Sequence, residues 1–154
     1  MTEDLLARFG IYGGSIAVAF IAGMFPLVSI ELFLITLSAA LHLSLVQILT
    51  CCGIAAVSHQ IAKTITYYAG VGALEHGKIG KKIENARPRI EKWNKAPKLV
   101  LTLGAVFGIP PLYLLGFIAE PLMRIRFLTF TLIVFFGRLV RFIFLAAIPL
   151  VFDI

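Results

Sequence analysis

Isolated charges inside long apolar stretches are the first candidates for chemistry in this sequence. Glu31 is the only charged residue between Phe9 and Ala62. A carboxylate at membrane depth is costly unless it is paired, hydrated or protonated, so it is a functional candidate by default. We predict that Glu31 acts in proton coupling or as a switchable counter-ion. The alternative is a structural ion-pair partner.

His59, Lys63 and Tyr67 follow one another at intervals of four residues. This spacing places an imidazole, an ammonium and a phenol along one face of a helix. We expect Lys63 and Tyr67 to contact an anionic substrate and His59 to relay a proton, a role that imidazole groups can take. The alternatives are an ion pair between Lys63 and Glu31 and a hydrogen bond from His59 to a backbone carbonyl.

Arg138 and Arg141 are the only charges in the apolar run from Phe127 to Phe152. A separation of three residues puts both guanidinium groups on one helix face, well inside the run rather than at its ends. The planar fork of arginine suits phosphate. We therefore predict that this pair binds a phosphate or lipid headgroup, and the alternative is a purely structural charge network.

Signatures of enzymes and metal sites are missing from the sequence. The three histidines have no metal-binding spacing, and no nucleophile elbow, P-loop or dinucleotide-binding fingerprint occurs. Cys51 and Cys52 are adjacent within an apolar run, where we expect small packing residues rather than a disulfide. We predict a protein that is not an enzyme and holds neither metal nor cofactor.

The elements that must position these residues are apolar helices. Of the 154 residues, 60% are apolar, and three stretches reach the roughly 20 apolar residues that cross a bilayer. We predict an all-α integral membrane protein with a single membrane domain over residues 1–154. The first apolar run is too long for a secretory signal peptide and follows two acidic residues.

Two glycine-proline breaks divide the chain into halves with a common plan. Gly23 and Pro26 interrupt the first stretch, while Gly108, Pro110 and Pro111 interrupt the second. We predict that each break makes a re-entrant helical hairpin and that a long transmembrane helix follows it. For the second break the alternative is a single kinked span, and the positive-inside rule favours the hairpin. A hairpin makes no net crossing, so the second half enters the membrane from the opposite side, as in inverted-repeat transporters. The predicted repeats cover residues 5–74 and 99–152.

The formal charge of +6 is concentrated between the repeats, because eight of the 14 basic residues lie in the loop 75–98. Basic residues beside apolar spans set membrane orientation and meet anionic headgroups. We predict that this loop is cytoplasmic and that the chain does not bind nucleic acid.

These motifs resemble the DedA/VTT family, also called SNARE-associated Golgi proteins, and in particular its short bacterial members. The resemblance covers roughly residues 20 to 140. It rests on Phe25-Pro26-Leu27-Val28-Ser29-Ile30-Glu31-Leu32, Tyr67-Tyr68-Ala69-Gly70, Gly108-Ile109-Pro110-Pro111, and Met123 through Phe127 to Gly137. It implies two re-entrant hairpins that meet in the bacterial inner (plasma) membrane and a role in moving lipids, including polyprenyl phosphates, between leaflets.

The chain departs from the family where substrate is held. Many members carry arginines around the second-hairpin proline, where this chain has Gly104 to Phe107 before it and Tyr113 after it. We expect Tyr113 to line the substrate site and Arg138 and Arg141 to replace those arginines. The predicted function is translocation of an anionic lipid, either a polyprenyl phosphate or a phospholipid. The predicted partners are membrane lipids, and the size of the chain is compatible with a homo-oligomer. The alternatives are an ion-coupled small-solute transporter and a structural membrane protein.

Overall fold

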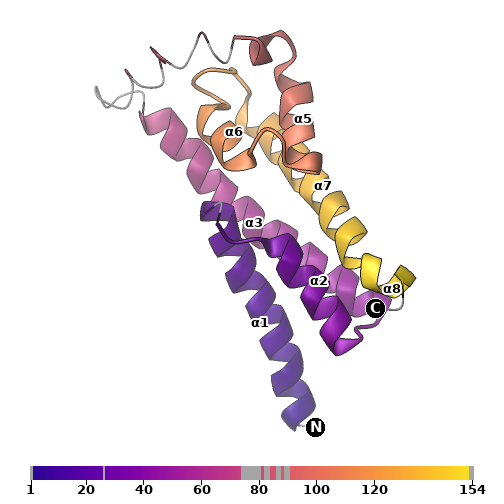
Figure 1. Ribbon diagram of the computed structural model, residues 1–154. Helices are drawn as coiled ribbons and strands as arrows, with labels where there is room; N and C mark the ends of the chain where they lie inside the picture. Colours follow the sequence, from indigo (N-terminus) through magenta and orange to yellow (C-terminus); the bar gives the residue numbers. More distant parts are fainter. Residues whose placement is uncertain are drawn as a thin grey trace. The chain divides into compact units, whose positions relative to one another are not determined.

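The described part of the chain is helical and falls into two compact units. The computed structural model describes residues 2–25, 27–73, 81, 84–85, 88 and 91–152, and these contain helices and turns but no strand (Figure 1). One unit comprises Met1–Ala62 and Arg138–Ile154, and the other comprises Lys63–Gly137. Their boundaries fall inside the two long helices, α3 (Leu45–Ala73) and α7 (Phe127–Ala146). The all-α prediction is confirmed for these residues.

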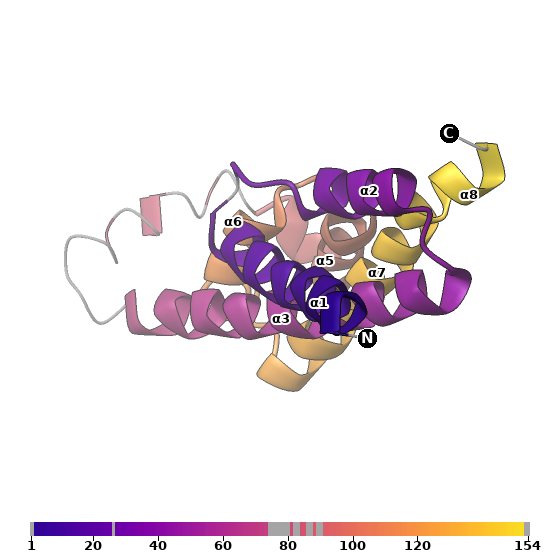
Figure 2. The ribbon, with the colours of Figure 1, turned by 90° about the horizontal axis from the view of Figure 1, so that it is seen from below.

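The first unit begins with two helices joined at the first predicted break. Helices α1 (Thr2–Met24) and α2 (Ile30–Leu41) are in contact and run in opposite directions, side by side in both views (Figures 1 and 2). Pro26 lies outside the described residues. α2 also contacts the short C-terminal helix α8 (Ile148–Phe152).

A capping box formed by Ser44 and Gln47 starts α3. The Gln47 N–H donates to Ser44 Oγ at 3.4 Å, and the Ser44 N–H donates to Gln47 Oε1 at 3.0 Å. These bonds satisfy backbone donors that have no acceptor within the helix. Within the first unit α3 packs closely on α1: Ser58 Oγ donates to the carbonyl of Ile16 at 2.7 Å, and a Cβ at Gly23 would lie 2.5 Å from that of Ala62.

The second unit contains the second glycine-proline break. Helix α5 (Pro97–Phe107) follows the short 3-10 helix η1 (Trp93–Lys95) and ends at Gly108, whose φ of 81° lies in the left-handed region that glycine adopts without steric cost. α6 (Leu112–Ile118) then packs against α5. The basic loop 75–98 includes η1 and the first residues of α5, and half of its residues lie outside the described ranges.

α6 is shorter than the sequence suggests. The apolar run continues to Met123, but the helix ends at Ile118. Pro121 explains the difference, because proline disfavours helical backbone at the residue before it and has no N–H to donate. The chain then turns, with Arg124 at a φ of 53° and its N–H bonded to the carbonyl of Glu120 at 3.0 Å, before α7 begins.

Glycines allow the helices of the second unit to approach closely. A Cβ at Gly137 in α7 would lie 2.6 Å from that of Ala105 in α5, and a Cβ at Gly70 in α3 would overlap the carbonyl of Phe117 in α6. Leu115, Phe130 and other fully buried apolar side chains fill the core of this unit. Gly53 in α3, by contrast, faces open space.

Among the described residues, two helical segments are long and apolar enough to cross a membrane: α3, and the 25 residues from Phe127 to Val151. The second segment includes α7 and most of α8, which are separated at Ala147 just before Pro149. The two helices form the last long stretch that the sequence predicts.

Replacing Gly70 with alanine is expected to destabilise the protein by about 1–3 kcal/mol, because the added methyl group would push α6 away from α3. Gly53→Ala is the matched control on the same helix: its Cβ meets nothing within 4 Å, and alanine favours helix by up to about 1 kcal/mol. Thermal unfolding in detergent micelles should show a lower Tm for Gly70→Ala only. Equal shifts would contradict this packing.

Candidate functional site

Glu31 is placed by the first turn of α2. Ser29 caps this helix by accepting a hydrogen bond from the Leu32 N–H at 3.2 Å, and its hydroxyl group donates to Glu31 Oε2 at 3.2 Å. The positive end of the helix dipole also favours a carboxylate here. The local sequence therefore fixes the position of the Glu31 carboxylate, and the Ser29 hydroxyl group occupies one of its two oxygens.

The other oxygen of Glu31 is shared by the two arginines of α7. Arg138 Nη1 lies 2.6 Å from Glu31 Oε1, and Arg141 Nε lies 3.0 Å from the same atom. All three residues belong to the first unit. The three-residue spacing thus puts both guanidinium groups on one face of α7, as predicted. The structure brings Glu31, Arg138 and Arg141 together into a single cluster, which we call the charge cluster.

The charge cluster is partly buried and carries more positive than negative charge. One carboxylate and two guanidinium groups sum to +1. Within the described part of the chain, Arg138 Nε is buried and has no hydrogen-bond partner. The Arg138 side chain is 11% exposed, and those of Glu31 and Arg141 are 17% and 25% exposed, so the cluster is partly exposed. An anion that reached it would find positive charge and a vacant donor.

His59 is buried in the first unit. It is not adjacent in sequence to Glu31, Arg138 or Arg141, but it lies close to the end of α7. Its ring meets that of Phe142 edge to face, with centroids 5.9 Å apart. A Cβ at Gly23 would lie 3.2 Å from the His59 carbonyl, so this part of α3 packs against α1. These contacts describe a packed histidine. Its predicted part in proton relay remains a prediction.

Lys63, Tyr67 and Tyr113 belong to the second unit, and each has different surroundings there. Lys63 is buried and engaged in an interaction. The Tyr67 hydroxyl donates to the carbonyl of Ile125 at 2.8 Å, and its ring packs against Phe127 and Phe130. Tyr113, on α6, is 42% exposed. Their substrate-binding roles remain predictions, and the contacts of Tyr67 are those of a residue that holds the turn before α7.

The residues of the second break form the connection between α5 and α6. Gly108 closes α5 by donating to the carbonyl of Gly104 at 3.1 Å. Pro110 follows a cis peptide bond, and the carbonyl of Pro111 accepts bonds from the first N–H groups of α6. Gly23 lies against α3, as described above.

Ser29 was not among the predicted site residues, although the sequence carries a signal for it. A serine directly before an apolar helical run is a typical N-cap, and Glu31 lies within reach in the first turn. The shared use of Glu31 Oε1 by two arginines had no such local signal, because the partners are 107 and 110 residues away.

Comparisons of the chain with protein-family models, curated proteins and solved structures found no match. The likeness to the DedA/VTT family therefore remains a prediction from the motifs. Within the described ranges, no group of three or more His, Cys, Asp or Glu side chains is placed to hold a metal ion.

Glu31 and Arg138 are expected to be energetically coupled more strongly than Glu31 and Arg141. The first pair is shorter and its arginine less exposed. A double-mutant cycle with Glu31→Gln and Arg138→Gln, measured by unfolding in detergent, should give a coupling of about 1–3 kcal/mol. The corresponding cycle with Arg141→Gln should give a smaller value.

A coupling near zero for Arg138, or a larger one for Arg141, would contradict this description of the charge cluster. Lys92→Gln serves as a control, because Lys92 is exposed and distant in sequence from the cluster. Its cycle with Glu31→Gln should show no coupling.

Proposed function

We propose that the protein is an integral membrane protein that moves an anionic lipid between leaflets and binds the lipid phosphate at the charge cluster. The observation that carries this proposal is the sharing of one carboxylate by two partly buried guanidinium groups, with a vacant donor at Arg138 Nε.

The exposed faces of the long helices support a membrane environment. Along α7 the exposed large apolar side chains recur every four residues: Leu128, Leu132, Phe136, Val140 and Phe144. α3 shows the same spacing with Leu49, Val57, Ile61 and Ile65. A core helix of a water-soluble protein buries such a stripe, whereas a transmembrane helix can turn it toward lipid.

The order of the elements supports the repeat plan. Each half runs helix, glycine-proline break, shorter helix and long helix, with α1, α2 and α3 in the first half and α5, α6 and α7 in the second. The breaks expose apolar side chains, with Leu27 94% and Ile109 77% exposed. In our proposal both breaks are the tips of re-entrant hairpins, the halves are inverted repeats, and loop 75–98 is cytoplasmic.

The depth of the charges supports a substrate in the membrane rather than in water. At 1.5 Å per residue, Arg138 and Arg141 lie about 17 and 21 Å along the axis from Phe127. The segment from Phe127 to Val151 is long enough for a bilayer core about 30 Å thick, so both charges fall near its middle. A phosphate headgroup that crosses the membrane must pass this depth.

The ion pairs also suggest how the lipid phosphate and Glu31 compete for the two arginines. Glu31 already accepts from both arginines, so it acts as a resident counter-ion that an incoming phosphate displaces or joins. The same ion pairs favour a second candidate, a structural membrane protein in which the charge cluster only joins α2 to α7. The two candidates differ in whether exchange of lipid depends on the arginines.

Leaflet exchange in proteoliposomes tests the proposal. Fluorescent phosphatidylglycerol and phosphatidylcholine are compared, and polyprenyl phosphate is assayed in parallel. The double variant Arg138→Ala, Arg141→Ala should slow exchange of the anionic lipids at least about tenfold, the effect of losing about 1.4 kcal/mol of binding. Glu31→Gln should bind anionic lipid more tightly but also exchange it more slowly, because the counter-ion that drives release is removed.

The matched control is the double variant Lys92→Gln, Lys95→Gln. It also removes two positive charges, but from an exposed stretch outside the long helices. It should exchange lipid at the wild-type rate. Wild-type exchange by the folded double arginine variant would refute a role for these arginines. Absence of exchange by the folded wild-type protein would favour the structural candidate.

A further inference from the structure

A second positively charged feature lies in the other unit, at the ends of two helices. A pocket of about 290 Å³ is bordered by the start of α5, the turn before α7 and the first turn of α7. Its lining residues are Pro97, Lys98, Met123, Arg124, Ile125, Arg126 and Thr129. Three of the seven are basic and none is acidic, so the pocket has a strongly positive lining.

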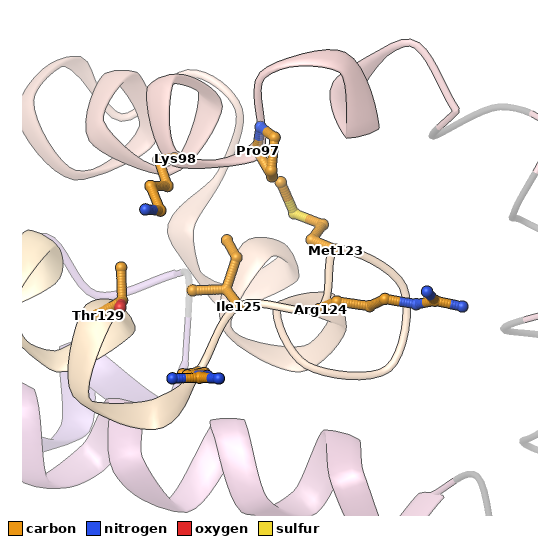
Figure 3. Close-up of a pocket in the computed structure, with 7 residues that line it drawn as sticks. Pro97, Lys98, Met123, Arg124, Ile125 and Thr129 are labelled. Atoms are coloured by element: carbon orange, nitrogen blue, oxygen red, sulfur yellow. The ribbon is translucent and has the colours of Figure 1, made fainter.

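The side chains are arranged for a small polar ligand. Figure 3 shows Lys98 and Thr129 on one side of the pocket, near Ile125, while Arg124 extends outward at the opposite edge. Met123 and Ile125 are buried and make an apolar floor. Within the described part of the chain, no carboxylate forms an ion pair with Lys98, Arg124 or Arg126.

Two helices begin at this pocket. Pro97 and Lys98 are the first residues of α5, and Thr129 lies in the first turn of α7. The first N–H groups of a helix have no acceptor within it, and the positive end of its dipole attracts anions. Backbone donors and basic side chains together are the usual means of holding phosphate.

The turn that carries two of the basic residues is held in place. Tyr67 donates to the carbonyl of Ile125, and the Ile125 N–H donates to the carbonyl of Ala119 at 2.8 Å. Arg124 and Arg126 flank this anchored residue. The pocket is therefore built on fixed backbone, while the basic side chains at its edge are exposed and able to adjust to a ligand.

We infer that this pocket is a binding site for a phosphate group, distinct from the charge cluster of the first unit. Lys98 and Arg126 neutralise the phosphate, Thr129 offers a hydroxyl donor, and Arg124 contacts it from the edge. In the proposed topology α7 enters the membrane directly after Arg126, so the site lies at headgroup level. A lipid headgroup and a free phosphate ester share the required chemistry, and experiment distinguishes them.

Calorimetric titration of the full chain in dodecyl maltoside micelles, which contain no phosphate, tests this inference. The probes are dihexanoyl phosphatidic acid, inorganic phosphate and, as an uncharged match, dihexanoylglycerol. Phosphatidic acid should bind at least about tenfold more tightly than dihexanoylglycerol. The variant Lys98→Gln, Arg126→Gln should lose at least about tenfold in affinity, and Thr129→Val should lose less.

Lys92→Gln, Lys95→Gln is the matched control for charge and should bind like the wild type. Failure of the wild type to bind either phosphate probe would overturn the inference, as would equal losses in the pocket and control variants. Comparable binding of inorganic phosphate would identify the phosphate group itself as the ligand. Binding of phosphatidic acid alone would identify a lipid headgroup.

The titration is repeated with Arg138→Ala, Arg141→Ala to separate this site from the proposed function. Binding that still depends on Lys98 and Arg126 supports the pocket whatever the result of the leaflet-exchange assay. Binding that disappears with the α7 arginines, in a variant with a wild-type unfolding midpoint, would assign the phosphate to the charge cluster and refute the pocket.

Discussion

The interaction on which the first unit depends is the sharing of Glu31 between Arg138 and Arg141. It joins the first turn of α2 to α7 across more than a hundred residues of sequence. Removing one partner of a buried pair leaves the other charge without compensation, which is destabilising. This constraint holds the first turn of α2 next to Arg138 and Arg141, and it creates a net positive, partly exposed group of side chains.

The same constraint connects stability to function. A charge cluster that only stabilised the fold would be expected to satisfy its donors, yet Arg138 Nε has no partner among the described residues. In our proposal the phosphate of a lipid completes the cluster for part of the transport cycle. The pocket at Lys98 and Arg126 would then hold phosphate at the membrane surface, and the charge cluster would receive it at depth.

The sequence predicted the elements better than their contacts. Ser44 and Gln47 mark the start of α3 because capping is a local interaction, and Gly108 marks the end of α5 for the same reason. Helical periodicity predicted that the two arginines lie on one face of α7. α6 ends before the apolar run does, because Pro121 stops the helix. The pairing of Glu31 with both arginines, and the pocket between two helix starts, depend on tertiary packing that no local pattern encodes.

The central claim is that α7 carries its arginines at membrane depth, and the electron paramagnetic resonance of a spin label on α7 tests it most directly. The label is attached to Val140→Cys, an exposed position between the two arginines, after Cys51 and Cys52 are replaced by alanine. In liposomes the label should be relaxed by oxygen and shielded from a water-soluble nickel complex, whereas a label at Lys95→Cys should show the reverse. Ready access of the nickel complex to position 140 would place this face in water and contradict the account.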